Sequence, residues 1–457
     1  MFPYKTFLLF LLCLPGAVSV TYAQGKYFTP FKDDSLKKTV FVAAVKDYYK
    51  KQSESLSSQN KKEIAEFYKQ IEKSVTEDIR EKGTMVSGDA SAYLQRIVEE
   101  IIRVNPELKD LPGRVFFSKA FWPNAYTSMD GTIVFNAALF YRLSNEAQVA
   151  YVLCHEISHY YLQHSKNAIE RYVTITNSKE YQQQLKEIKK QKYEQNKELD
   201  KLEKLELFGS RKHSRTHESE SDSMALQFLK KTFFDIREAV PVLALLDTID
   251  KEEFNTEAAL KNIFNHPDYP FQERWVKKKQ AFFGGTDLRE DYKADIDSLK
   301  THPDCKERIR KIEPVIAVIS QANAKKNLVD EKKFAELVKI FPFEAIDNCY
   351  QEEFISMCLY ECLKLLVKFP DDAYLNTMAG KCLNSIYKHQ KEHTLNRVVN
   401  LPSPYFQRDY NLLLEFIEKL RLDEVGSINY YFLLRNEEKF KGYPAFNETL
   451  KEARRNF

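Results

Sequence analysis

Residues 144–164 read SNEAQVAYVLCHEISHYYLQH, and the organisation of the chain follows from this stretch. The apolar run over residues 149–153 predicts a helix that is buried on most sides. Ser144 is the expected N-cap, and the helix is expected to continue through His164. A buried helix is an unusual place for the polar residues at positions 155–159, because buried polar groups cost free energy unless partners satisfy them.

The segment His155-Glu156-Ile157-Ser158-His159 has the spacing of a metal site. Side chains four residues apart lie on one face of a helix, so His155 and His159 can bind the same ion. The glutamate between them projects toward a metal-bound water and can accept its proton. The pattern therefore predicts a zinc site with Glu156 as general base. The alternative is a pair of histidines satisfied within the core.

A catalytic zinc usually has three protein ligands and one open position. His164 follows the second histidine without a glycine turn, so we expect it to be a helix-end histidine and not a ligand. A second predicted helix carries Glu218, Glu220 and Asp222. On chemistry alone these three acids compete, because one carboxylate can bind the metal while another orients a ligand histidine. A plain acidic helix start is the alternative.

The motifs and their order resemble the HtpX and CAAX prenyl protease family of zinc metallopeptidases, of gluzincin type. The resemblance implies that Glu218 is the third zinc ligand and that Asp222 holds a ligand histidine in place. Ser221 stands where this family usually has alanine. The matching segments are Asn124-Ala125, residues 131–136, residues 155–159, Gln163-His164-Ser165, and Ser214-Arg215 with Glu218 and Asp222.

The same family carries a His-Pro segment with a downstream arginine after the ligand helix. Two segments of this chain resemble it, namely His266-Pro267 with Arg274, and His302-Pro303 with Arg308. His302 and His266 are therefore candidates for a latch or transition-state residue near the zinc. The alternative for both segments is a proline-bounded loop before a helix.

The resemblance implies a zinc-dependent endopeptidase that acts on protein or peptide substrates. Without later membrane spans, the chain resembles the soluble exported branch, the BepA-like envelope proteases, and this implies a role in envelope protein quality control. The alternative is a non-catalytic, zinc-stabilised chaperone or scaffold that binds clients through C-terminal helices. The presence of Glu156 favours the enzyme, because metal binding alone does not need that carboxylate.

The N-terminus has the composition of a secretory signal. Lys5 precedes an apolar stretch over residues 6–20, which is short and broken by proline and glycine. Cleavage is expected after Ala23, so residues 1–23 form the expected signal peptide. The protein is then expected in the periplasm or secreted. Six cysteines remain, an even number that permits disulfides without showing them.

Composition favours a mainly α protein of the α+β class with a small sheet. The chain has 457 residues, only 12 of them glycine, and a formal net charge of +3, which does not suggest a nucleic-acid binder. Strands are expected over residues 114–118, 124–127 and 132–135. The segment 131–136 is the expected edge strand for an extended substrate.

The expected domains are a zinc metallopeptidase domain over residues 24–312 and a helical domain over residues 313–457. Part of the second domain weakly resembles one tetratricopeptide unit. Its helices are a candidate surface for an envelope protein partner. His213 and His217 are four apart, but we expect them to be surface residues.

Overall fold

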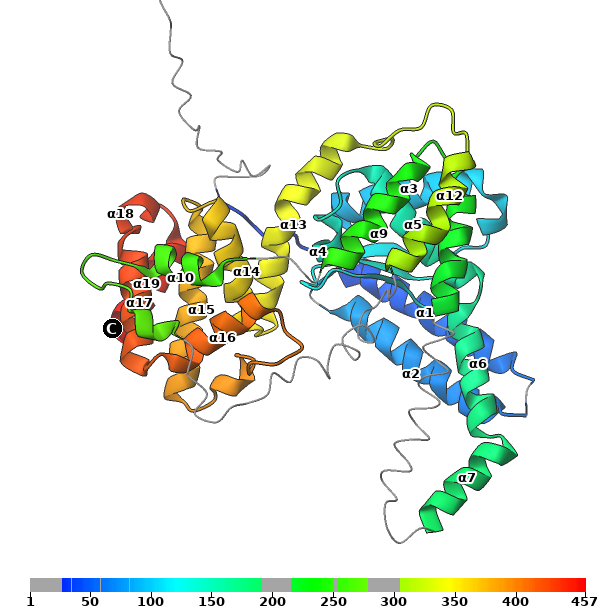
Figure 1. The fold of residues 1–457 in the computed structure, drawn as a ribbon, viewed down its shortest axis with the longest axis horizontal. Coiled ribbons are helices and arrows are strands. Elements are labelled where there is room, and N and C mark those ends of the chain that lie inside the picture. The colour runs from blue at the N-terminus through cyan, green and yellow to red at the C-terminus, as the bar shows by residue number, and fades with distance from the viewer. Residues whose placement is uncertain are drawn as a thin grey trace, which may run out of the picture.

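The computed structural model describes residues 27–33, 35–57, 59–81, 83–190, 215–249, 254–277 and 305–457. This part of the chain is mainly helical with one small sheet, which confirms the predicted fold class (Figure 1). None of its helices is both long and apolar enough to cross a membrane. The expected signal peptide lies outside the described residues.

The sheet has four strands in the order β1-β2-β4-β3. β2 and β4 are parallel, whereas β1 pairs with β2 and β3 pairs with β4 in the antiparallel sense. The three expected strands are present, and β1 is additional. The strands are β1 (Thr84–Met85), β2 (Val115–Ser118), β3 (Ala125–Thr127) and β4 (Ile133–Asn136).

β4 is not the edge strand that the sequence predicted. It pairs with β2 on one side and β3 on the other, and all four of its residues are buried. β3 forms the edge on this side instead, with β1 at the other edge, and two of the three β3 residues, Tyr126 and Thr127, are only partly buried. The apolar character of residues 133–135 reflects this central position, because a central strand is covered on both faces.

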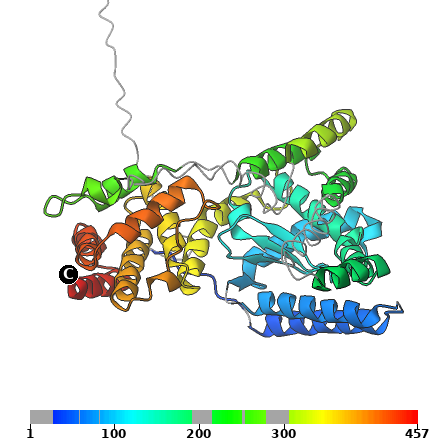
Figure 2. The same cartoon turned by 60° about the horizontal axis from the view of Figure 1, so that its bottom comes forward.

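Side chains of alternate residues on the central strands enter different cores. Val115 and Phe117 pack with the helices that carry the predicted metal ligands, whereas Phe116 and Val134 face the opposite way. That second face is covered by a hairpin of two long helices (Figure 2). These are α1 (Ser35–Glu54) and α2 (Lys61–Arg80).

The predicted helix around residue 155 is α5 (Glu146–Tyr161), and it is buried from its first residue to Ser158. Its N-cap is Asn145, whose side chain accepts a hydrogen bond from the Gln148 N–H at 3.1 Å. Ser144 is therefore not the cap. Ser144 lies one residue before the cap, and its N–H donates to the side chain of Gln148.

The sequence predicted that α5 continues through His164, but the helix ends before this residue. Gln163 adopts a left-handed conformation with φ of 55°, and a new helix, α6 (His164–Thr176), begins after it. The turn residue Gln163 is not a glycine, so the local sequence does not indicate that the helix breaks here. The charged stretch that follows is helical as α7 (Lys179–Lys190), and residues 191–206 lie outside the described part.

The described chain has two large hydrophobic cores, and the division of the helices between them differs from the expected domain boundary at residue 312. That boundary falls inside α12 (Cys305–Val318), whose Ile312 and Ile316 pack in the first core. α10 (Thr256–Phe264) packs in the second core, although it precedes α12 in sequence. α13 (Glu331–Gln351) lies between the two groups of helices and contributes to both cores (Figure 1).

The other helices complete these two units. All six cysteines of the described residues are buried free thiols. The remaining elements are α3 (Gly88–Val104), η1 (Pro106–Leu108), α4 (Ala137–Phe140), a helix over residues 215–229, η2 (Ile236–Glu238), α9 (Ala239–Thr248), η4 (Glu273–Trp275), α14 (Ile355–Lys368), α15 (Ala373–Lys391), η5 (Leu395–Arg397), α16 (Arg408–Lys419), α17 (Leu422–Leu434), α18 (Glu437–Phe440) and α19 (Pro444–Asn456).

Candidate metal centre

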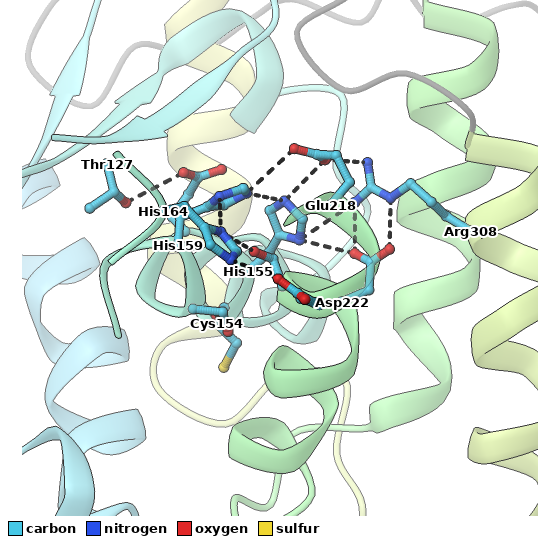
Figure 3. A network of polar contacts seen from close by, with 12 residues as sticks. Thr127, Cys154, His155, His159, His164, Glu218, Asp222 and Arg308 are labelled. Atoms are coloured by element: carbon cyan, nitrogen blue, oxygen red, sulfur yellow. Dashed lines mark hydrogen bonds and ion pairs between the residues drawn. The ribbon is translucent and has the colours of Figure 1, made fainter. Parts of the chain in front are cut away.

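Two histidines from α5 and one glutamate from the 215–229 helix converge on one point (Figure 3). The Nε2 atoms of His155 and His159 are 3.1 Å apart, and each lies 3.5 Å from an oxygen of Glu218. Ligand atoms around a tetrahedral zinc, with bonds of about 2.0–2.1 Å, lie about 3.3 Å from one another. The spacing of the three side chains therefore fits a single zinc ion.

The charge of this cluster also calls for a cation. Two imidazole nitrogens and a carboxylate face one another in a buried site, which is unfavourable unless positive charge lies between them. Burial lowers the pKa of His155, but its hydrogen bonds with Asp222 and Glu218 outweigh burial and raise it to about 9. In the metal-free protein a proton on His155 and the guanidinium of Arg308, 2.8 Å from Glu218, thus supply positive charge.

Asp222 holds His155 in the orientation that metal binding needs. One of its oxygens lies 2.9 Å from His155 Nδ1 and accepts a hydrogen bond from the Tyr151 hydroxyl at 2.8 Å. Burial raises the pKa of Asp222, but hydrogen bonds from Arg308 and His155 outweigh it, so the pKa lies well below its usual range. Ionised Asp222 keeps a proton on Nδ1 and leaves Nε2 for the metal.

Arg308 connects the two acids of the site. Its Nε and one terminal nitrogen each donate to Asp222 at 2.7 Å, and its other terminal nitrogen lies 2.8 Å from Glu218. The side chain is only 3% exposed. Sequence reasoning named Arg308 only as the companion of His302, so its role in holding the carboxylates was missed. The signal in the sequence that could have pointed to Arg308 was its position six residues after His302, in the His302-Pro303 pair.

Glu156 lies beside the ligands and faces the edge strand. Its side chain is buried, and its Oε2 is 3.4 Å from Thr127 Oγ1 on β3. A cleft of about 370 Å³ opens next to His159, with Tyr48 of α1 and Ser128 among its lining residues. Thr127, which contacts Glu156, and His159 both line this cleft.

The other predicted candidates lie elsewhere. Glu220 points to His164, at 3.2 Å, and not to the ligand cluster. His266 pairs with Tyr269 through the backbone, and its ring lies 5.1 Å from that of Tyr431 in α17, within the C-terminal helices. His302 lies outside the described residues.

His164 and His217 are closer to the site than the sequence suggested. His164 is buried, its Nδ1 lies 3.0 Å from His159 Nδ1, and the ring of His217 stacks on it at 4.1 Å. Burial, followed by the charge of His217, lowers the pKa of His164. The break at Gln163 brings His164 back beside the ligand helix, and sequence periodicity could not predict that break.

The chain matches a known protein family. Residues 89–316 match peptidase family M48, and this segment contains β2, β3, β4, α5 and all of the converging residues. No curated protein is significantly similar to the chain. Through residues 89–316, the chain belongs to peptidase family M48, a family of metallopeptidases.

Proposed function

We propose that this metallopeptidase is a zinc-dependent endopeptidase of gluzincin type, with His155, His159 and Glu218 as the ligands and Asp222 as the residue that orients His155. The observation that carries the proposal is the convergence of three ligand atoms from two helices at distances that suit one zinc ion. Two histidines with one glutamate are a ligand set of catalytic zinc.

Glu156 is the general base in this proposal. Bound zinc supplies Lewis acidity, which polarises the peptide carbonyl and makes water more acidic. Glu156 accepts the proton of the attacking water and then passes it to the leaving amine. Its buried position beside Thr127 limits its motion, and Thr127 itself lines the cleft next to His159. A non-catalytic scaffold would not need a carboxylate at this place.

An extended substrate would pair with β3, the edge strand next to β4. An edge strand presents backbone N–H and C=O groups that can pair with another chain. Thr127 of β3 contacts Glu156, so a peptide along this strand would pass the proposed base. This proposal replaces the expectation that residues 131–136 hold the substrate.

The biological setting is also a proposal. The composition of residues 1–23 supports export to the periplasm or secretion, and the resemblance to envelope proteases supports a role in protein quality control. The C-terminal helices would then offer a surface to clients or to an envelope protein partner. His302 remains a candidate latch, since Arg308, six residues later, reaches the proposed metal site.

The test compares Glu156→Gln with the parent protein on an unfolded protein substrate. We expect kcat/KM to fall at least about 100-fold, because a general base usually contributes a factor of this size or more. The zinc content should not change. Glu66→Gln, an exposed substitution on α2, is the matched control. Full activity of Glu156→Gln, or loss of zinc from it, would contradict the assigned role. His155→Ala should lose most of the zinc, and retention would contradict the ligand assignment.

A further inference from the structure

The second ligand histidine also has a partner for its other ring nitrogen. His159 directs Nε2 toward His155 and Glu218, and its Nδ1 lies 3.0 Å from Nδ1 of His164. A neutral imidazole that binds metal through Nε2 carries its proton on Nδ1. His159 must then donate this proton, and Nδ1 of His164 must accept it.

The position of this proton determines the tautomer of His164. With Nδ1 as acceptor, a neutral His164 carries its own proton on Nε2, and this atom lies 3.2 Å from an oxygen of Glu220. The side chain of His164 is 7% exposed, whereas that of Glu220 is 53% exposed. The donors are therefore aligned in one direction, from the ligand His159 through buried His164 to a carboxylate at the surface.

The backbone turn at Gln163 is what makes this contact. In a straight helix, a residue five positions after His159 would lie about 140° around the helix axis from it, because there are 3.6 residues per turn. The left-handed conformation of Gln163 ends α5 and returns His164 to the side of His159. A non-glycine residue in this conformation is strained, and such strain often lies at functional sites.

We propose that His164 and Glu220 are positioning residues that hold His159 in the orientation and tautomer required for metal binding. The inference rests on the proposed metal site. His164 would do for His159 what Asp222 does for His155, with an imidazole placed between the ligand and the carboxylate. Neither residue lines the cleft next to His159, so both would act through the ligand and not on the substrate.

A second metal ion is the competing interpretation of these residues. Atoms of His164, His217 and Glu220 lie within 4.8 Å of one another and could hold an ion. An ion on Nε2 of His164 would move the proton of that ring to Nδ1. Two N–H groups, from His159 and His164, would then face each other at 3.0 Å. The hydrogen bond to the ligand and the second ion therefore exclude each other.

The test uses three substitutions at His164 in the full chain. His164→Ala removes the acceptor, His164→Asn can place an amide oxygen near the position of Nδ1, and His164→Gln places its amide nearer to Nε2. Zinc affinity is measured by competition with a chelator, and kcat and KM are measured at saturating zinc. We expect His164→Ala to weaken zinc binding 10- to 100-fold, with lower kcat and little change in KM.

The pattern of rescue separates positioning from packing. His164→Asn should recover most of the zinc affinity and His164→Gln much less, although both are neutral amides. Glu220→Ala should cost only a few-fold, because its carboxylate is half exposed. His217→Ala removes the stacked ring but no donor or acceptor of the proposed series, so it is the matched control, and its zinc affinity should stay within about twofold of the parent.

Four results would overturn the inference. One is unchanged zinc affinity in His164→Ala alongside a large loss in His155→Ala, which would leave the proposed function intact. Another is equal affinity of the Asn and Gln variants. The third is two zinc ions in the parent and one in His217→Ala, which would identify a second metal site. Full zinc retention in His155→Ala would remove both the proposed function and this inference. If His164→Ala does not fold, the Asn and Gln variants still decide the question.

Discussion

Replacing Asp222 with asparagine should lower both the stability of the metal-free protein and the affinity of the site for zinc. Asp222 accepts two hydrogen bonds from Arg308 and one from Tyr151, and it also holds Nδ1 of His155. Asparagine keeps the shape but removes the charge, and it turns an N–H₂ group toward a donor. Removing one partner of a buried ion pair costs about 3–5 kcal/mol.

The remaining contact of Arg308 with Glu218 reduces this cost, so we expect the metal-free protein to lose about 3 kcal/mol of unfolding free energy. Zinc affinity should fall 10- to 100-fold, the usual effect of losing the partner of a ligand histidine. Urea unfolding in the presence of a chelator measures the first effect, and chelator competition measures the second. Asp110→Asn, at an exposed position, is the control. A loss of less than about 1 kcal/mol together with unchanged zinc affinity would refute the reasoning.

Three further predictions follow from single features of the chain. The pKa of His155 is raised to about 9 in the metal-free protein, so protonated His155 contributes up to about 3 kcal/mol to the free energy of unfolding. This contribution is fully present below pH 6.5 and is lost as the pH rises through 9. Urea unfolding of chelator-treated protein should show the decline, and zinc-loaded protein should not. Gln163→Gly should preserve zinc binding and leave thermal stability equal or higher, since glycine adopts a positive φ without strain, whereas Gln163→Val should lower both. Gly426→Ala should lower the thermal stability of the C-terminal helices without changing zinc content, because the added Cβ would clash with the backbone oxygen of Asn456; unchanged stability would show that α19 can shift.

The local pattern of the chain was sufficient to predict the fold class and the two histidines that converge. Apolar periodicity predicts a buried helix over α5 and short strands beside it, and spacing places His155 and His159 on one face. The third ligand was different. Three acids competed on chemistry alone, and only the resemblance selected Glu218. In the structure Glu218 faces the histidines and Glu220 faces away, a difference set by how the 215–229 helix is rotated against α5.

The features that sequence reasoning missed depend on tertiary contacts. The break before His164 lies at a glutamine in the left-handed region, where turn chemistry would have predicted glycine or asparagine. The order of the strands depends on pairing, and an apolar segment such as residues 133–135 is compatible with both a central strand and a covered edge. Arg308 is held by two carboxylates that are 86 and 90 residues away in sequence, so no local pattern reveals its burial.

The segment after α12 shows why a boundary at residue 312 cannot separate catalysis from the C-terminal helices. Glu146, in the first turn of α5, is fully buried and accepts hydrogen bonds from the backbone N–H groups of residues 328–330 at 2.6–2.7 Å. The start of α13 then packs Phe334 and Phe341 into the first core. A chain ending near residue 313 would leave the Glu146 carboxylate buried without these donors, at the base of the helix that carries His155. A buried carboxylate without hydrogen-bond donors costs several kcal/mol. Loss of zinc binding in this truncated chain would therefore show that the helix carrying His155 had lost its support, and would say nothing about whether the C-terminal helices bind client proteins. A chain that keeps residues up to the end of α13 would retain these contacts, although the half of α13 that packs in the second core would then be exposed.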